Sequence, residues 1–330
     1  MTRVTISDVA RRAGVSTMTI SRVVNNRGEV HPETRERILQ VIEELGYRPS
    51  SVARSLITQK SQTVGLVVPD ITNPFFPDIV RGAEDVAYRE GYTLYVSNTD
   101  EKPDREALVM ERLESSMVDG LILCAPRQPG EQLHPLLKRH RHVVVINREV
   151  PLELAGSVVN DDLFGSMRAV HHLLASGRNR IGCLAGPPNS RTGQLRVQGF
   201  ETALAATGQR LDPTLIETCD PNEHGGHVGL LRLLERHPDL DGVVAFNDLV
   251  ALGALLAAQE KQLAVPTQLA VVGNDDIRMA ALATPPLTTI RIDRYVLGQM
   301  AMEMLLGQIQ GKPCRTVTLR PELVVRQSAP

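Results

Sequence analysis

One face of a predicted helix near the N-terminus carries side chains suited to reading DNA bases. Ser16 can cap this helix, which runs to about Asn25 and turns Ile20, Val23 and Val24 inward. The opposite face holds Thr17, Met18, Ser21, Arg22 and Asn25. An arginine can direct two N–H groups at one guanine in the major groove. This face therefore predicts base recognition, whereas an ordinary three-helix bundle would leave Arg22 in solvent.

Polar side chains directly follow several predicted strands further along the chain. They are Asp70, Asn147, Asn247, Asp248, Asn274 and Asp275. Ligands of open parallel sheets bind at the carboxyl ends of the strands. Paired Asn and Asp side chains suit a polyhydroxylated ligand, and Phe75 and Phe76 would cover its apolar face. Any one of these polar residues is equally explained as a helix cap, but their recurrence favours a binding site.

The base-reading helix belongs to a short all-helical segment. Thr5 and Asp8 have capping-box spacing at the start of a first helix, which Gly14 ends. A third helix begins near Pro32, ends at Gly46 and buries Ile38, Val41, Ile42 and Leu45. Three short helices with a glycine-containing turn between the first two predict a helix-turn-helix.

A linker follows the third helix. Its segment 48–56, RPSSVARSL, is shorter than the roughly 12 to 15 residues that hold a helix in water. We expect this segment to fold only against DNA. An apolar side chain on such a helix can wedge between base steps in the minor groove, which gives Leu56 a function.

Short β-rich runs alternate with helical stretches from residue 61 onward. The runs are TVGLVVP, YTLYVS, VDGLILC, HVVVIN, RIGCLAG, DGVVAFN and LAVVGN. This alternation predicts an α/β domain with parallel sheets. Asp119-Gly120 and Asp241-Gly242 open two of the runs about 120 residues apart, which weakly suggests two halves built alike.

The run VTISDVARRAGVSTMTISRVVNN, followed by LGYRPSSVARSL, resembles the head and hinge of the LacI/GalR family of transcription regulators, and the match continues to the C-terminus. The resemblance implies a helix-turn-helix domain at 1–46, a hinge at 47–60 and a two-lobed periplasmic-binding-protein-like α/β domain at 61–330. The N-lobe would span about 61–159 with a returning segment at about 291–318. The C-lobe would span about 160–290 with the C-terminal end.

The resemblance also implies functions for individual residues. Thr17, Met18 and Arg22 would read bases, while Ser16, Ser21 and Asn25 would hold phosphates. The implied DNA-binding set further includes Thr5, Ser50, Val52, Ala53 and Leu56, with Ala53 and Leu56 at the operator's central step. The implied effector contacts are Phe75, Phe76, Asn147, Arg148, Arg196, Asn247 and Asp275. His31 replaces the family's usual Ser, which predicts a weaker cap on the third helix.

Three departures from the family pattern affect the expected effector. Asn147 stands where relatives often have Asp, Asn274 replaces a common aromatic residue, and Ile292 replaces a polar one. Fewer acids would then lie beside Arg148, Arg196 and Arg191, and a guanidinium suits a carboxylate or phosphate. We therefore expect a sugar acid slightly more than a neutral monosaccharide.

Composition and charge exclude several classes of protein. The 330 residues are 42% hydrophobic and 22% charged, unlike a disordered or collagen-like chain, and no apolar run is long enough for a membrane span. The sequence has no secretory leader, which predicts a cytoplasmic protein. Residues 1–60 carry ten Lys or Arg and six Asp or Glu, a net charge of +4, whereas the remainder has a net charge of -6. The basic head alone therefore predicts a polyanionic partner.

Motifs for catalysis and for cofactors are missing. The four cysteines have no C-x-x-C spacing, and no G-x-S-x-G, H-E-x-x-H or G-x-G-x-x-G occurs, so we expect no metal, no cofactor and no catalytic residue. Asp220, His224 and His227 read as a polar cleft rim rather than a metal site. The expected protein is a repressor of carbohydrate genes, controlled by a small effector, that binds a pseudo-palindromic operator as a homodimer. A sugar-processing enzyme and a pure sugar-binding module remain as alternatives.

Overall fold

The computed structural model describes residues 4–24, 28–47, 60–208 and 212–330. The chain divides into two compact units, Met1–Ser61 and Gln62–Pro330, and each is described by itself. The expected hinge at 47–60 is described only at its two ends, so its limits stay a prediction. Within the described residues, no helix is both long enough and apolar enough to cross a membrane.

The N-terminal unit contains the three predicted helices. They are α1 (Ile6–Ala13), α2 (Thr17–Val24) and α3 (Pro32–Leu45). Thr5 and Asp8 form the predicted capping box, and Gly14 ends α1 in the left-handed conformation. Ile20 and Ile38 are fully buried in the small core that the three helices share. The helix-turn-helix prediction is therefore confirmed.

The cap of α3 is as weak as its sequence predicts. His31 stands at the N-cap position and its side chain makes no capping hydrogen bond. Pro32 is the first residue of the helix. Because proline has no backbone N–H, this position needs no hydrogen-bond acceptor from a cap. Gly46 ends α3 with a left-handed φ of 61°.

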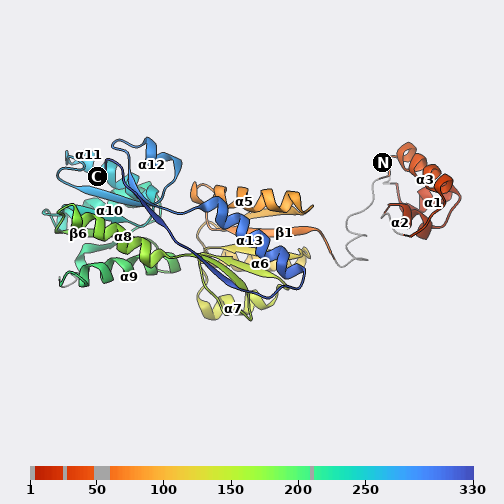
Figure 1. The fold of residues 1–330 in the computed structure, drawn as a ribbon, viewed down its shortest axis with the longest axis horizontal. Helices are drawn as coiled ribbons and strands as arrows, with labels where there is room; N and C mark the ends of the chain where they lie inside the picture. Colours follow the sequence, from red (N-terminus) through yellow and green to blue (C-terminus); the bar gives the residue numbers. More distant parts are fainter. Residues whose placement is uncertain (1–3, 25–27, 48–59, 209–211) are drawn as a thin grey trace. The chain divides into compact units, whose positions relative to one another are not determined.

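The larger unit has two lobes, each built on a six-stranded sheet covered by helices (Figure 1). The N-lobe sheet has the order β11-β5-β4-β3-β1-β2. Its strands are β1 (Thr63–Val68), β2 (Thr93–Asn98), β3 (Gly120–Cys124), β4 (Val143–Ile146), β5 (Gly156–Asn160) and β11 (Thr316–Leu319). Its helices are α5 (Phe75–Arg89), α6 (Pro103–Ser115), α7 (Gly130–Lys138) and α13 (Arg294–Ile309).

The C-lobe sheet has the order β12-β10-β9-β8-β6-β7. Its strands are β6 (Ile181–Ala185), β7 (Ile216–Thr218), β8 (Gly242–Ala245), β9 (Ala270–Asp275), β10 (Thr288–Arg291) and β12 (Glu322–Val324). Its helices are α8 (Asp162–Ala175), α9 (Arg191–Ala205), α10 (Glu223–Arg236), α11 (Asp248–Glu260) and α12 (Arg278–Leu282), with a short 3₁₀ turn at Pro213–Leu215. The chain crosses between lobes after β5, after β10 and after β11.

Seven strands were predicted and all seven are present. Five further strands were not predicted from the sequence and are only three to five residues long: β5, β7, β10, β11 and β12. Three of the five follow a long helix or complete a sheet edge, where a short run carries little pattern of its own. All described pairs are parallel except β10 with β12, so the predicted parallel α/β fold holds with one antiparallel edge.

Helix α5, which begins with Phe75 and Phe76, packs closely against α13 in the N-lobe (Figure 1). This packing holds the two aromatic residues in position. A Cβ atom on Gly82 would lie 2.1 Å from the carbonyl oxygen of Tyr295. A Cβ atom on Gly298 would lie 2.0 Å from the carbonyl oxygen of Ile79. Each helix therefore needs glycine so that the backbone of the other can approach.

This packing predicts that Gly298→Ala lowers the free energy of unfolding by about 3 kcal/mol, because backbone must move to make room. Gly307→Ala is the matched control in the same helix. Its Cβ would meet only the flexible Lys312 side chain at 3.3 Å, so stability should hold or rise by up to about 1 kcal/mol. Urea unfolding measures both changes, and equal stability of the two variants would contradict the packing argument.

Candidate functional site

The predicted base-reading residues lie on the exposed side of α2. Thr17, Met18 and Arg22 are exposed, with 65% of Met18 accessible, and Ser21 is half-buried. Arg22 Nη2 lies 3.9 Å from Met18 Sδ, so the two side chains share one face of the helix. The structure thus brings these four residues together on one surface.

Two of the predicted DNA contacts also serve as helix caps. Ser16 Oγ accepts the Thr19 N–H at 3.1 Å, and Thr5 is bonded to Asp8 through its backbone N–H and its hydroxyl. The remaining predicted DNA contacts lie outside the described residues: Asn25, Ser50, Val52, Ala53 and Leu56.

A pocket between the two lobes, called here the interlobe pocket, gathers the predicted effector contacts. Six of the seven line it: Phe75, Phe76, Asn147, Arg196, Asn247 and Asp275. Phe75 and Phe76 pack edge to face, with ring centroids 5.2 Å apart. The cavity has a volume of only about 30 Å³, enough for about two water molecules. A sugar therefore requires the pocket to widen.

Backbone strain concentrates around this pocket. Four of its lining residues have positive φ angles: Glu101 at 56°, Ala125 at 45°, Asn147 at 61° and Asp275 at 120°. Ala125 and Asn147 directly follow β3 and β4, Glu101 lies three residues after β2, and Asp275 is the last residue of β9. Non-glycine residues rarely adopt such angles, and where they do the strain often marks a ligand site. The strand ends of both lobes are thus held in unusual conformations around one cavity.

The guanidinium of Arg196 organises the C-lobe side of the pocket. Its Nε and Nη2 both lie 2.8 Å from Asp162 Oδ1, and its Nη1 donates to the Phe246 carbonyl. Asp275 Oδ1 lies 3.7 Å from Nη2, and the guanidinium stands 5.1 Å from the Phe246 ring centroid. The expectation that few acids lie beside Arg196 is therefore wrong, because Asp162 and Asp275 both lie next to its guanidinium.

Two carboxylates besides Asp162 interact electrostatically with this arginine. Asp275 and Asp248 are both buried, and burial together with their mutual repulsion raises the pKa of Asp248. Burial also raises the pKa of Asp275, although Arg196 and a hydrogen bond from Asn274 oppose the shift. Asp248 accepts hydrogen bonds from the Ile277 N–H at 2.8 Å and the Thr289 hydroxyl at 2.5 Å. The C-lobe floor therefore disfavours further negative charge.

A second buried arginine faces the pocket from the N-lobe, and the sequence analysis missed it. Arg127 is 4% exposed and donates two N–H groups to Glu101, one of them at 3.0 Å, and a third to the Ala125 carbonyl at 2.9 Å. Both Glu101 and Arg127 line the pocket. They follow β2 and β3, so the strand-end rule would have found them had it included Glu and Arg as well as Asn and Asp.

Some strand-end residues also act as caps or as links between neighbours. Asn247 Oδ1 caps α11 through the Val250 N–H at 2.8 Å, and its amide donates to the Pro221 carbonyl. Asn147 Oδ1 accepts from Asn160 Nδ2 at 2.9 Å. The cap interpretation therefore holds for Asn247, which nevertheless lines the pocket.

Two further departures from the family pattern lie at positions with different surroundings. Asn274 is buried and donates to Asp275 at 2.9 Å, whereas Ile292 packs in the N-lobe core.

Arg148, the seventh predicted effector contact, does not line the interlobe pocket. It lines a neighbouring cavity together with Arg191, and its Nη1 donates to the Gln128 carbonyl at 2.6 Å.

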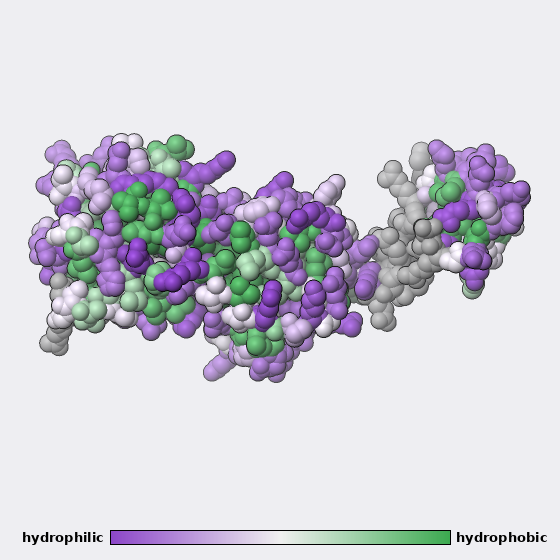
Figure 2. All heavy atoms as spheres, in the orientation of Figure 1, coloured by the Kyte–Doolittle hydropathy of each residue, from purple (hydrophilic) through white to green (hydrophobic). Residues whose placement is uncertain are grey.

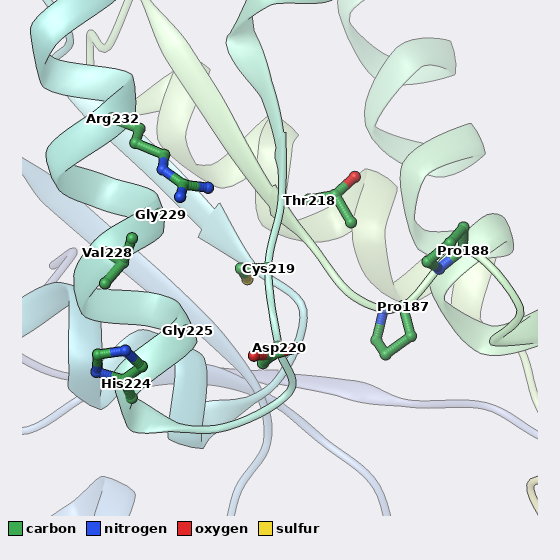
Figure 3. Close-up of a pocket in the computed structure, with 10 residues that line it drawn as sticks. All are labelled: Pro187, Pro188, Thr218, Cys219, Asp220, His224, Gly225, Val228, Gly229 and Arg232. Carbon is green, nitrogen blue, oxygen red and sulfur yellow. The ribbon is translucent and has the colours of Figure 1, made fainter. Parts of the chain in front are cut away.

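A third cavity, called the α10 pocket, lies within the C-lobe (Figure 3). It has a volume of about 350 Å³ between α10 and the loop that carries Pro187 and Pro188. Asp220 and His224 line it, but His227 instead pairs with Glu260 at 2.7 Å. In the described part of the chain, no group of three potential ligands could hold a metal ion. Asp220 and His224 therefore line the α10 pocket rather than the interlobe pocket.

Comparison with known proteins places both units in one family. Residues 5–50 match the model for "Bacterial regulatory proteins, lacI family", and residues 61–322 match "Periplasmic binding proteins and sugar binding domain of LacI family". The ribose operon repressor of Halalkalibacterium halodurans is 37% identical over 98% of this chain and 96% of its own length.

Solved structures are similar over most of the chain. The lac repressor dimer bound to operator and the anti-inducer ONPF has a TM-score of 0.88 at 28% identity, covering 99% of each chain. A LacI family regulator from Enterococcus faecium with bound ribose has a TM-score of 0.72 at 29% identity, covering 81% of this chain and 98% of the other. These proteins are transcription regulators and not enzymes. The chain described here belongs to the LacI family of bacterial transcription regulators.

Proposed function

We propose that this protein is a repressor whose affinity for a pseudo-palindromic operator is controlled by a sugar bound between its two lobes. The interlobe pocket supports the proposal that a sugar binds, because strained strand ends from both lobes surround one cavity there. The exposed face of α2 supports the proposal that the protein binds operator DNA. The similar ribose operon repressor and the similar ribose-bound regulator support a pentose as the first ligand to test.

On the DNA side, the first residues of α2 enter the major groove. Thr17, Met18 and Arg22 contact base edges, and the serines at positions 16 and 21 contact phosphates. Asn25 and the hinge residues Ser50, Val52, Ala53 and Leu56 complete the proposed contacts, with Leu56 at the central base step. Thr5 contributes at the start of α1. These assignments rest on position in the sequence and, for α2, on exposure.

Operator binding requires two copies of the chain related by two-fold symmetry. Apolar side chains are exposed on both lobes, among them Tyr88 at 79% and Leu282 at 82%. Figure 2 shows apolar areas among the hydrophilic residues on one side of the larger unit. They support a homodimer, and the proposed site of action is the bacterial cytoplasm, where the chromosome lies.

The interlobe pocket best fits the neutral, hydroxyl-bearing part of a sugar. Each lobe contributes one buried arginine that is already paired, Arg127 with Glu101 and Arg196 with Asp162. Such pairs still present N–H donors and carboxylate acceptors to hydroxyl groups. Phe75 and Phe76 cover the apolar face of the ring. Because the charges are matched, this pocket itself gives no reason to prefer a sugar acid.

The size of the cavity explains how ligand and operator affinity are coupled. A cavity of about 30 Å³ is far below the roughly 300 Å³ of ordinary small-molecule sites. A sugar must therefore bind a state in which the lobes are differently spaced, and the three crossovers transmit that change along the N-lobe to the hinges. Whether the sugar weakens or strengthens operator binding follows from which state DNA prefers.

Removing a base-reading side chain should cost specificity. We predict that Arg22→Ala weakens binding to the best operator by about 1 to 3 kcal/mol and relaxes the preference at one base pair, because a fork onto guanine is lost. Arg37→Ala, on the exposed side of α3, removes the same charge and should weaken all sequences equally. Fluorescence anisotropy over single-base operator variants measures both, and unchanged specificity in Arg22→Ala would reject its role.

Sugar binding should depend on the buried pocket charges but not on salt. We predict that calorimetry detects ribose binding, that Asp275→Asn weakens it at least tenfold, and that 0.05 and 0.5 M NaCl give similar affinities because the charges are paired and buried. Asp239→Asn, at an exposed carboxylate, is the control. A panel of aldoses and aldonates binding at equal strength in the wild type and Asp275→Asn would contradict the assignment.

A further inference from the structure

A second cavity lies beside the interlobe pocket, and the proposed function makes no use of it. This crossover cavity has a volume of about 420 Å³ and shares Asn147 with the interlobe pocket. Its wall includes Arg148 after β4 of the N-lobe, Arg191 at the start of α9 of the C-lobe, and the first crossover between lobes. Its size is within the range of small-molecule sites.

The two arginines bring positive charge into this cavity from opposite lobes. Arg148 is half-buried and has its hydrogen bond to the Gln128 carbonyl, while Arg191 Nη1 lies 3.4 Å from Gln194 Oε1. Neither forms an ion pair with any residue that the structure describes. Burial lowers the pKa of Arg148, Glu106 opposes that shift, and the charge of Arg191 adds to it. The two guanidinium groups are therefore close enough to repel each other.

Three carboxylates also line the cavity, but none of them forms an ion pair with Arg148 or Arg191. Asp162 is paired with Arg196 at 2.8 Å. Asp161 caps α8 by accepting the Phe164 N–H at 3.0 Å, and Glu149 is exposed. The α9 helix begins at Arg191, so the positive end of its dipole adds to the same side. Arg148 and Arg191 thus have no ion-pair partner among the described residues, although the Glu106 carboxylate acts on Arg148.

We propose that the crossover cavity binds an oxyanion, a phosphate or carboxylate group, between Arg148 of the N-lobe and Arg191 of the C-lobe. Guanidinium groups bind such anions with paired hydrogen bonds. A bound oxyanion replaces repulsion between the lobes with attraction to a shared partner. It therefore favours the arrangement of the lobes in which Arg148 and Arg191 face the same oxyanion next to the first crossover, and it acts as a second input to operator binding.

The oxyanion has two sources with the same chemistry. One is a free ion such as phosphate. The other is the charged end of a sugar whose ring lies in the interlobe pocket, since Asn147 borders both cavities. The second source rests on the proposed function, whereas the first does not.

Calorimetric titrations of the full-length protein at constant ionic strength distinguish these sources. The probes are inorganic phosphate, ribose and ribose 5-phosphate, and the proteins are the wild type, Arg191→Gln and Arg148→Gln. Arg168→Gln is the matched control, because Arg168 is an exposed C-lobe arginine that does not line the cavity. Arg191 is exposed and its one side-chain partner is the neighbouring Gln194, so Arg191→Gln should unfold at the wild-type temperature without anions.

If the cavity is a free-ion site, phosphate binds the wild type and Arg168→Gln with similar affinity. It binds Arg191→Gln and Arg148→Gln at least tenfold more weakly. A charged effector predicts that ribose 5-phosphate binds the wild type at least tenfold more tightly than ribose, and that Arg191→Gln abolishes this gain. Identical binding of phosphate and of ribose 5-phosphate to the wild type and Arg191→Gln would overturn the proposal. Phosphate binding that depends on Arg191, without any ribose binding, would instead refute only the proposed sugar.

Discussion

The pairing of one buried charge determines how the C-lobe side of the cleft is built. The guanidinium of Arg196 is buried, and a buried charge would be very costly without a partner. Asp162 supplies that partner, and the Phe246 carbonyl and Asp275 complete the shell. These groups come from the start of α8, the end of β8 and the end of β9. One side chain therefore ties a crossover to two strand ends.

The N-lobe repeats this solution with different residues. Arg127 is held by Glu101 and by the Ala125 carbonyl, which join the ends of β2 and β3. The interlobe pocket is small, and its two buried arginines are each paired with a carboxylate. Its lining is therefore polar, with its positive and negative charges balanced. Ligand selection by hydroxyl geometry follows from that balance, as does the need for the lobes to move. The cavity at the first crossover differs because its two arginines have no ion-pair partner in the described chain.

Much of this architecture was predictable because its signals are local. Capping spacing at Thr5 and Gly14 located the first helix, and long apolar runs located seven strands. Strand-end Asn and Asp residues predicted a cleft site, and six of seven effector residues lie there. What the sequence could not show is pairing at a distance: Asp162 neutralises Arg196 across 34 positions, and Glu101 neutralises Arg127 across 26. For this reason the sequence alone could not show that Arg196 lies beside acids, and the pocket gives no preference for a sugar acid.

The central claim is that sugar in the interlobe pocket and DNA at the head share one free-energy coupling. The direct measurement determines the affinity for ribose with and without a selected operator duplex, and the affinity for that operator with and without saturating ribose. Thermodynamic linkage requires both affinities to change by the same factor, and we expect a factor of about 5 to 150. Ribose that binds at full strength while leaving operator affinity unchanged would contradict the account.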